Sequence, residues 1–154
     1  MIRSLIALIV FVALSFAAAI PGMFFKADAW YEQLAKPALT PPNWVFGVVW
    51  TFLFTLMSIA AWLVWRHGGL IENKSTLAFY VVQLAFNAGW TCIFFGLHQP
   101  ALALAELVCL WLAILAALIA FWSRDTLAGI LMMPYLAWVT FAGYLNWAFW
   151  RLNT

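Results

Sequence analysis

The residues of this sequence that could take part in chemistry are a few polar and indole side chains within long apolar runs. Gln83, Asn87 and Glu106 are the polar ones, and Trp50 and Trp138 are two of the 11 tryptophans. A buried indole N–H needs a hydrogen-bond partner, which a carboxamide or carboxyl group can provide. Walls of this composition suit a wide, flat, mostly apolar ligand with a few polar edges. The pattern therefore favours a ligand cavity.

Other kinds of site find little support in the sequence. His67 and His98 are both expected in loops, and no nucleophile–base pair or metal-ligand cluster is visible, so we predict neither a metal site nor a required cofactor. The lysines all lie outside the apolar runs, which leaves none for the Schiff base of a retinal protein. Glu106 alone carries charge well inside a run, too little for an ion channel. The net charge of +2 is spread along the chain and gives no basis for nucleic-acid binding.

The composition places these side chains in a membrane. Charged residues make up 8% of the chain, against roughly 25% in an ordinary globular domain. The mean hydropathy is +1.02, so membrane lipid is the expected solvent and the expected partner of the surface. We therefore predict a multi-pass integral membrane protein and expect it in a bacterial cell membrane.

Five apolar stretches are long enough to cross a bilayer, since a spanning helix needs about 20 residues. They cover residues 3–25, 43–65, 75–97, 100–122 and 126–150. The predicted fold is an all-α membrane protein, a five-transmembrane-helix bundle forming one domain over residues 1–154, with a structured loop between the first two helices. Arg3 and the small residues 17–19 also resemble a signal peptide, but the apolar run continues to Phe25 and favours a retained helix.

The rare polar groups gather in one half of this bundle. At a rise of about 1.5 Å per residue, several of them lie within about 6–15 Å of one membrane surface. They are Trp50, Asn87, Trp90, Glu106 and Asn146. We call this surface the loop face, because residues 26–42 connect the first two helices there.

The third predicted helix has two distinct faces at about 100° per residue. One face is aromatic and polar and is expected to line a cavity; it carries Phe79, Gln83, Asn87, Trp90 and Phe94. The opposite face is a stripe of small residues that lets another helix approach closely; it carries Ala78, Ala85, Gly89, Cys92 and Gly96. A neighbour within the protomer and a second protomer are both candidates for that helix, and we favour a homodimer.

Two further helices present matching faces. The fifth carries Tyr135, Trp138, Ala142 and Asn146 at helical spacing, and the second carries Phe46, Trp50 and Phe54. Aromatic residues at this spacing often form only a closed core, but the deep indoles beside polar groups favour a ligand cavity. Glu106 is expected to be either a protonated structural hydrogen-bonding group or a ligand contact.

The segment 26–42 is expected to cover the mouth of this cavity as a lid. Its prolines stiffen the backbone, because proline fixes φ and restricts the preceding residue. Aromatic side chains there and just after it could cap the pocket or anchor at the headgroup level. The lid residues are Trp30, Tyr31, Lys36, Pro37, Pro41, Pro42 and Trp44.

Three segments together resemble the TspO/MBR family of tryptophan-rich sensory proteins and translocator proteins (peripheral-type benzodiazepine receptors). They are "WYEQLAKPALTPPNWVFGVVW", "QLAFNAGWTCIFF" and "PYLAW" followed by "LNW", in order and at family spacing. The resemblance implies five transmembrane helices, commonly a dimer, and a cavity for porphyrins and synthetic isoquinoline or benzodiazepine-type ligands. It also implies a role in tetrapyrrole transport, stress sensing or light-dependent protoporphyrin breakdown.

Individual positions match the family's functional residues. Trp50 and Trp138 match the pair linked to porphyrin breakdown. The positions that line or border the family's ligand cavity are matched by Tyr31, Asn87, Trp90, Ala142 and Glu106, the last usually an aspartate.

Two departures from the family pattern occur. Leu39 replaces a tryptophan of the lid, and Ala148 replaces a tyrosine of the sterol-recognition motif, here "LNWAFWR". Such sterol motifs are weak patterns in any case, so sterol binding is doubtful.

The sequence thus predicts a membrane receptor or carrier for porphyrin-like small molecules, with protoporphyrin or a heme-type tetrapyrrole as the ligand. The alternative is a light-dependent enzyme that degrades protoporphyrin with Trp50 and Trp138 as redox or radical partners. A purely structural bundle is a third hypothesis, under which both indoles would tolerate phenylalanine without loss of binding.

Overall fold

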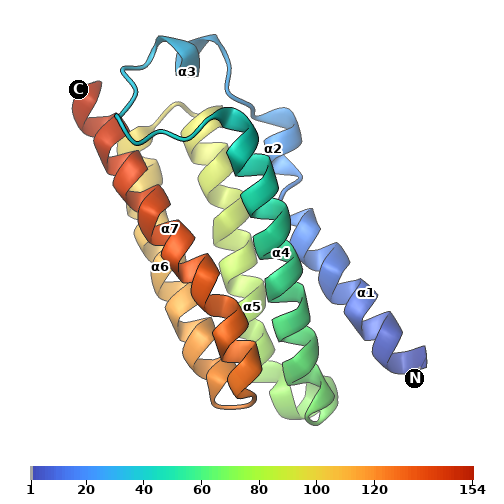
Figure 1. The fold of residues 1–154 in the computed structure, drawn as a ribbon. Helices are drawn as coiled ribbons and strands as arrows, with labels where there is room; N and C mark the ends of the chain where they lie inside the picture. Colours follow the sequence, from blue (N-terminus) through green and yellow to red (C-terminus); the bar gives the residue numbers. More distant parts are fainter. Residues whose placement is uncertain (1) are drawn as a thin grey trace.

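The computed structural model describes residues 2–154, and this part of the chain is helical without strands. Three short or peripheral helices, α1 (Ile2–Ala17), α2 (Pro21–Phe24) and α3 (Ala29–Gln33), precede the main bundle. The bundle consists of α4 (Asn43–Arg66), α5 (Gly69–Thr91), α6 (Pro100–Trp122) and α7 (Thr126–Leu152), and a π-helical turn, η1 (Cys92–Gly96), extends α5. Figure 1 shows these long helices side by side, with α3 above one end of them.

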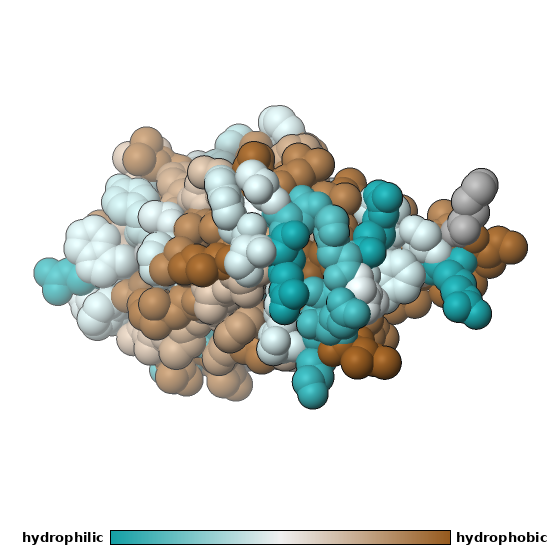
Figure 2. All heavy atoms as spheres, turned by 90° about the horizontal axis from the view of Figure 1, so that it is seen from below, coloured by the Kyte–Doolittle hydropathy of each residue, from teal (hydrophilic) through white to brown (hydrophobic). Residues whose placement is uncertain are grey.

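The four long helices form a closed ring in which α4 packs against α5 and α7, and α6 packs against the same two. Each of these segments, Asn43–Arg66, Gly69–Gly96, Pro100–Trp122 and Thr126–Leu152, is long and apolar enough to cross a membrane. We call the end opposite the loop face the far end; it carries the α4–α5 and α6–α7 turns. Figure 2 views the far end and shows hydrophilic residues across its middle with hydrophobic residues around them, as expected where the ends of spanning helices meet water.

The predicted first span, 3–25, is not one continuous helix. The helix α1 ends at Ala17, and residues 18–20 form turns whose backbone N–H groups bond three residues back. Pro21 has no N–H to continue the helical ladder to Ala17, so the helix breaks before it and restarts as α2. The 16 residues of α1 rise only about 24 Å, less than the roughly 30 Å of a bilayer core. Residues 2–154 therefore contain four long spans where five were predicted, and α1 packs along α4.

The third predicted helix also begins earlier than expected. Its start was predicted at residue 75, but α5 begins at Gly69 and contains Asn73 as a non-helical residue. The Asn73 carboxamide donates to the carbonyl oxygens of His67 and Gly69, at 3.2 and 3.0 Å. A polar residue that bonds backbone carbonyls upstream kinks the helix rather than starting it.

The far-end half of the bundle is solidly packed. Fully buried side chains from α4, α5, α6 and α7 fill it, among them Ala60, Ala61, Val64, Tyr80, Ile114, Ala117, Phe121 and Ala128. A buried polar cluster ties α1 to this core: the Tyr80 hydroxyl lies 2.6 Å from Ser15 Oγ and donates to the Phe11 carbonyl at 3.0 Å. Ser58 Oγ donates to Ser15 Oγ at 2.8 Å, so no hydroxyl of the cluster is left unpaired in the apolar interior.

Candidate functional site

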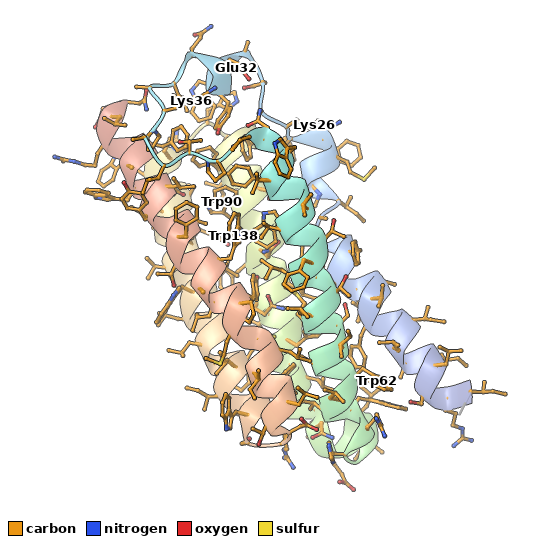
Figure 3. The ribbon with its side chains drawn as sticks, viewed as in Figure 1. Lys26, Glu32, Lys36, Trp62, Trp90 and Trp138 are labelled. Atoms are coloured by element: carbon orange, nitrogen blue, oxygen red, sulfur yellow. The ribbon has the colours of Figure 1, made fainter. Side chains whose placement is uncertain are left out.

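The loop-face half of the bundle encloses a cavity of about 700 Å³. Its walls come from the α1–α2 turn, the first half of α4, the end of α5, and the parts of α6 and α7 beside them. The cavity lies directly beneath residues 26–42, and Figure 3 shows Trp90 and Trp138 within the bundle below that loop. The predicted cavity residues that line it are Tyr31, Phe46, Trp50, Phe54, Asn87, Trp90, Trp138 and Ala142.

Eight of the 22 residues that line the cavity are aromatic, and several of their rings are in contact with neighbouring rings. The Trp50 ring lies 5.4 Å from Phe54 and 6.0 Å, edge-on, from Tyr135. The Trp138 ring lies 5.9 Å, edge-on, from Phe46. These separations are those of favourable aromatic pairs, so the walls hold their shape around the space.

Trp138 carries an unpaired polar atom in this wall. Its indole Nε1 is buried and, among residues 2–154, has no hydrogen-bond partner. A buried N–H without a partner costs free energy comparable to a lost hydrogen bond. The atom has essentially no accessible surface, so a ligand in the cavity would reach it only if the neighbouring side chains moved.

Two polar residues that do not line the cavity, Tyr135 and Asn146, form hydrogen bonds with residues that do. Asn87 Nδ2 donates to the Tyr135 hydroxyl at 3.0 Å, and Trp90 Nε1 donates to Asn146 Oδ1 at 2.9 Å. Asn146 Nδ2 in turn donates to the Pro100 carbonyl at 2.7 Å, which joins α5, α6 and α7. Tyr135 and Asn146, predicted as cavity residues, therefore hold lining residues in place.

Gln83 and Phe94 are likewise buried behind the lining. Gln83 Nε2 lies 3.8 Å from the Met57 sulfur, and its Oε1 has no partner within the described chain. Phe94 stacks on the Trp90 ring at 5.1 Å. The predicted face of the third helix is thus inward at these positions but reaches the cavity only at Asn87 and Trp90.

Phe79 was predicted on the same face and lies outside the interior, with 42% of its surface exposed. The buried side of α5 is defined by Thr76, Leu77, Tyr80, Gln83, Leu84 and Asn87. At about 100° per residue, Phe79 lies at the edge of that side, where it meets lipid. The predicted face is therefore inward at the other four positions and wrong at Phe79.

Glu106 lies between α5 and α6, outside the cavity lining. A Cβ atom at Gly89 would lie 3.3 Å from Glu106 Oε1, so the carboxyl group fills the space that this glycine leaves open. Both carboxyl oxygens are buried and lack hydrogen-bond partners among residues 2–154. The structure therefore brings Glu106 beside the cavity wall rather than into it.

The loop over the cavity is fastened to the bundle at several points. Asp28 Oδ1 accepts from the Tyr31 backbone N–H at 3.1 Å, and Asp28 Oδ2 lies 3.2 Å from His98 Nε2. The Tyr31 backbone N–H and His98 lower the pKa of Asp28 below its ordinary value. The Tyr31 ring is buried between Phe95 and Phe149, at 5.5 Å from each, and burial raises the pKa of its phenol. At the end of the chain, Asn153 exchanges two hydrogen bonds with the backbone of Ala35, at 2.9 and 3.1 Å.

The remaining lid residues divide between the loop and the membrane surface. Trp30 stacks on His98 at 4.3 Å, and Pro37 is buried. Lys36 pairs with Glu32 at 3.5 Å on the outside of the loop (Figure 3). Trp44 is 70% exposed, which fits an anchor at the headgroup level better than a cap on the cavity. Pro41 is partly buried and Pro42 is exposed, immediately before α4.

Comparison with known proteins identifies the family. A model of the TspO/MBR family matches residues 6–151. The chain is 49% identical over 146 residues to protein CrtK of Rhodobacter capsulatus, covering 93% of this chain and 89% of that protein. The chain belongs to the TspO/MBR family. Identity is 46% over 143 residues to a tryptophan-rich sensory protein of Cereibacter sphaeroides (93% and 89% covered) and 40% over 126 residues to the human translocator protein (80% and 75% covered).

Family membership confirms the resemblance that the sequence motifs indicated. Together with the four long apolar helices, it makes the chain a multi-pass membrane protein. The relatives' names describe tryptophan-rich sensory and translocator proteins.

Several cavity residues of this TspO/MBR chain were missed by sequence reasoning. The α1–α2 break contributes Ala18, Ala19, Gly22 and Met23, and Phe25 and Lys26 follow directly. Small apolar residues carry no chemical signal, but Pro21-Gly22 within an apolar run marks the break that exposes them. Phe95 was also missed, because the π-helical turn rotates it from the position that a regular helix would give.

The residues of the predicted dimer stripe in this TspO/MBR chain lie in two kinds of environment. Gly89 admits Glu106, and a Cβ at Gly96 would lie 3.0 Å from the Phe25 ring, so both glycines permit close approach within one protomer. Cys92 is partly buried beside them, whereas Ala78 and Ala85 are exposed. The alternative of a neighbour within the protomer therefore applies at the two glycines.

Proposed function

We propose that this protein is a membrane receptor or carrier that binds porphyrins and other flat hydrophobic ligands in the cavity beneath the 26–42 loop. The observation that carries the proposal is the cavity itself, which measures about 700 Å³ and has mostly apolar walls that include eight aromatic residues. Ligand pockets for small molecules measure about 300–1,000 Å³ and are lined by apolar and aromatic side chains with a few polar groups. A tetrapyrrole has the flat shape and the polar atoms that such a space would accept.

The polar groups at the wall support this choice of ligand. Asn87 lines the cavity with a carboxamide already oriented by Tyr135, and Asn43 and Thr91 are further polar lining residues. Pre-oriented polar groups on an apolar wall fix the orientation of a ligand without needing to rearrange. The role that fits this arrangement is tetrapyrrole transport or stress sensing, in which binding and release are the chemistry.

A second candidate function is light-dependent breakdown of protoporphyrin. Trp50 and Trp138 line the same cavity, so one bound ring would contact both indoles. An indole can act as a redox or radical partner, and this reaction would not need the usual acid, base or nucleophile. The two functions share the binding site and differ in whether the pigment survives illumination.

The experiment is a titration of the purified protein with protoporphyrin IX in detergent, followed by tryptophan fluorescence in the dark and by porphyrin absorbance under light. Wild type is compared with Trp50→Phe and Trp138→Phe, and with Trp147→Phe as the control, because Trp147 is exposed and outside the lining. We expect saturable quenching that weakens roughly two- to tenfold for each cavity variant and stays unchanged for the control.

The outcomes separate the hypotheses. Saturable quenching with stable pigment supports a receptor or carrier, whereas light-dependent pigment loss that disappears in the double variant supports the enzyme. Binding that tolerates both phenylalanine substitutions without change would support a purely structural role for the indoles. Absence of saturable quenching in the wild type would overturn porphyrin binding.

Assembly and membrane placement complete the proposal. We expect a homodimer in a bacterial cell membrane, with Ala78 and Ala85 available to a second protomer because both are exposed on α5. We also expect α1, the turn and α2 to cross the membrane together as a fifth, broken span, which would put the termini on opposite sides. Native mass spectrometry and labelling of single cysteines placed at residues 4 and 154 in intact cells test these expectations.

A further inference from the structure

We infer that Lys26 forms an anion-binding subsite at the rim of the cavity, so that the preferred ligand is a flat ring with carboxylate groups along one edge. The inference rests on the proposed porphyrin-binding function and names the chemical class within it. It is carried by the position of Lys26 in the cavity lining, by its lack of an ion-pair partner, and by a second hollow beside it.

Lys26 is the one charged side chain in the cavity lining described by residues 2–154. The other polar lining residues are Tyr31, Asn43, Asn87 and Thr91, together with the indoles. A cation at the edge of an otherwise neutral and apolar space attracts an anion there more strongly than it would in open water, because the walls are of low dielectric. The charge of the lining is therefore asymmetric and positive at one side.

No carboxylate of the described chain neutralises this lysine. Asp28, two residues away, accepts from the Tyr31 backbone and pairs with His98. Glu32 pairs with Lys36 on the outside of the loop. Figure 3 shows Lys26 at the end of α2, apart from Glu32 and Lys36 above the bundle. Neither acidic group forms an ion pair with Lys26, which remains available to an anion.

A second hollow of about 380 Å³ adjoins the cavity at this position. Lys26 lines both spaces, as do Met23, Phe25 and Phe95, and the second hollow also contains His98. A ring held in the cavity would find room for an edge group in the hollow, next to Lys26. Asp28 also lines this hollow, where its carboxylate holds His98 Nε2 at 3.2 Å. A ligand carboxylate would therefore accept its charge-assisted hydrogen bond from Lys26.

Lys26 and Asn87 together indicate how such a ligand would lie. Both line the cavity, Lys26 just after α2 at the loop face and Asn87 on α5. A molecule with neutral polar atoms on its ring and carboxylates on one edge could meet both residues. A flat hydrocarbon would satisfy neither, and a neutral ring at most Asn87.

The test measures dissociation constants for protoporphyrin IX and for its dimethyl ester, which has the same ring but no negative charge. Protein is held in nanodiscs of phosphatidylcholine, so that no anionic lipid competes. Wild type is compared with Lys26→Gln and Lys26→Arg, and with Lys74→Gln as a matched control at the far end. We expect wild type to bind the diacid about three to ten times more tightly than the diester, as a solvent-accessible charge pair allows.

The expected result is that Lys26→Gln removes this preference, while Lys26→Arg and Lys74→Gln keep it. Added salt should weaken binding of the diacid more than that of the diester. Equal saturable affinities of wild type for the two ligands, or the same preference in Lys26→Gln, would overturn the subsite and leave porphyrin binding in place. Failure of both ligands to bind would instead overturn the proposed function.

Discussion

The helix α6 passes from a cavity wall at Leu107 and Leu110 to a solid core at Ile114, Ala117 and Phe121. The same change occurs along α4, from Phe46 and Trp50 at the cavity to Ala60 and Val64 in the core. At the far end, small residues let the helices approach closely, and buried rings such as Tyr80 and Phe121 fill the space that remains. The bundle is therefore solid in one half and open in the other.

Three glycines illustrate the difference between the packed half and the open half. A Cβ at Gly129, in the far-end half, would lie 2.6 Å from the Trp122 ring and 2.9 Å from its Cα. A Cβ at Gly22 or Gly47, in the cavity lining, would have no atom within 4 Å. The far-end glycine is required by close packing, and the cavity glycines border empty space.

An aspartate–histidine pair occurs at each end of the bundle, and the two pairs differ in how exposed they are. At each end an aspartate caps a helix and pairs with a histidine from another loop: Asp28 with His98 at 3.2 Å, and Asp125 with His67 at 2.9 Å. The Asp125 side chain is 18% exposed and that of Asp28 is 48% exposed. A more exposed pair is better screened and weaker, so the loop over the cavity is held less firmly than the turn at the far end.

The largest expected effect on stability comes from shortening a side chain of α6, either in the core or at the cavity wall. Ile114→Ala should lower the free energy of unfolding by about 2–5 kcal/mol, because it leaves a void in close packing. Leu110→Ala should cost clearly less, because one side of Leu110 already faces the cavity. Equilibrium unfolding in mixed micelles measures both. Equal losses would contradict the division into a packed and an open half.

The glycines give the next largest contrast. Gly129→Ala should destabilise by about 1–3 kcal/mol, because the added methyl group collides with Trp122 and its backbone. Gly47→Ala should stabilise by up to about 1 kcal/mol, because it removes glycine's backbone freedom from a helix where space is free. The same unfolding assay reads the signs, and a loss for Gly47→Ala would show that the cavity wall is tighter than described.

Much of the fold followed from hydropathy alone, because lipid requires long apolar helices whose backbone groups are satisfied internally. Residues 43–65, 100–122 and 126–150 match α4, α6 and α7 within a few positions. The early start of α5 and the break in α1 did not follow. In both places local backbone chemistry, at Asn73 and at Pro21, decides the geometry within a sequence that stays apolar or helix-compatible.

The cavity was partly predictable for a related reason. Trp50, Asn87 and Trp138 combine a polar atom with a deep position, and such groups need an inward direction. Phe79 shares the helical phase of Asn87 but has no polar atom, and its side chain is exposed on the outside of the bundle. Gly22 and Ala18 line the cavity with no side chain or only a methyl group, which a search for chemical groups does not detect.

The two capping aspartates give a smaller, pH-dependent contrast. The Ala128 backbone N–H and His67 lower the pKa of Asp125, so its stabilising contribution is complete above the ordinary aspartate value of about 4 and is lost as pH falls through the lowered pKa. Asp125→Ala should cost about 0.5–2 kcal/mol near neutral pH. Asp28→Ala should cost less.

Thermal unfolding between pH 2 and pH 6 checks this contrast. The wild-type melting temperature should fall at the acid end, and the fall should be shallower in Asp125→Asn, which keeps a capping side chain without the titrating carboxyl group. A greater loss of stability for Asp28→Ala than for Asp125→Ala would reverse the order of the two ends.

The smallest effect on global stability is expected at the contact between the loop and the end of α7. Asn153→Ala removes both hydrogen bonds to Ala35, but these groups are exposed, so the free energy of unfolding should change by less than about 0.5 kcal/mol. Local opening of the loop around Ala35 should become more frequent, because the Ala35 amide loses its hydrogen-bond acceptor. Hydrogen exchange of a peptide covering residues 32–40 should therefore quicken in Asn153→Ala, while a far-end peptide covering residues 66–74 stays as in wild type. Unchanged exchange at 32–40 would mean that Tyr31 and the Asp28–His98 pair hold the loop without Asn153, and that the two ends are more alike in firmness than their exposed contacts indicate.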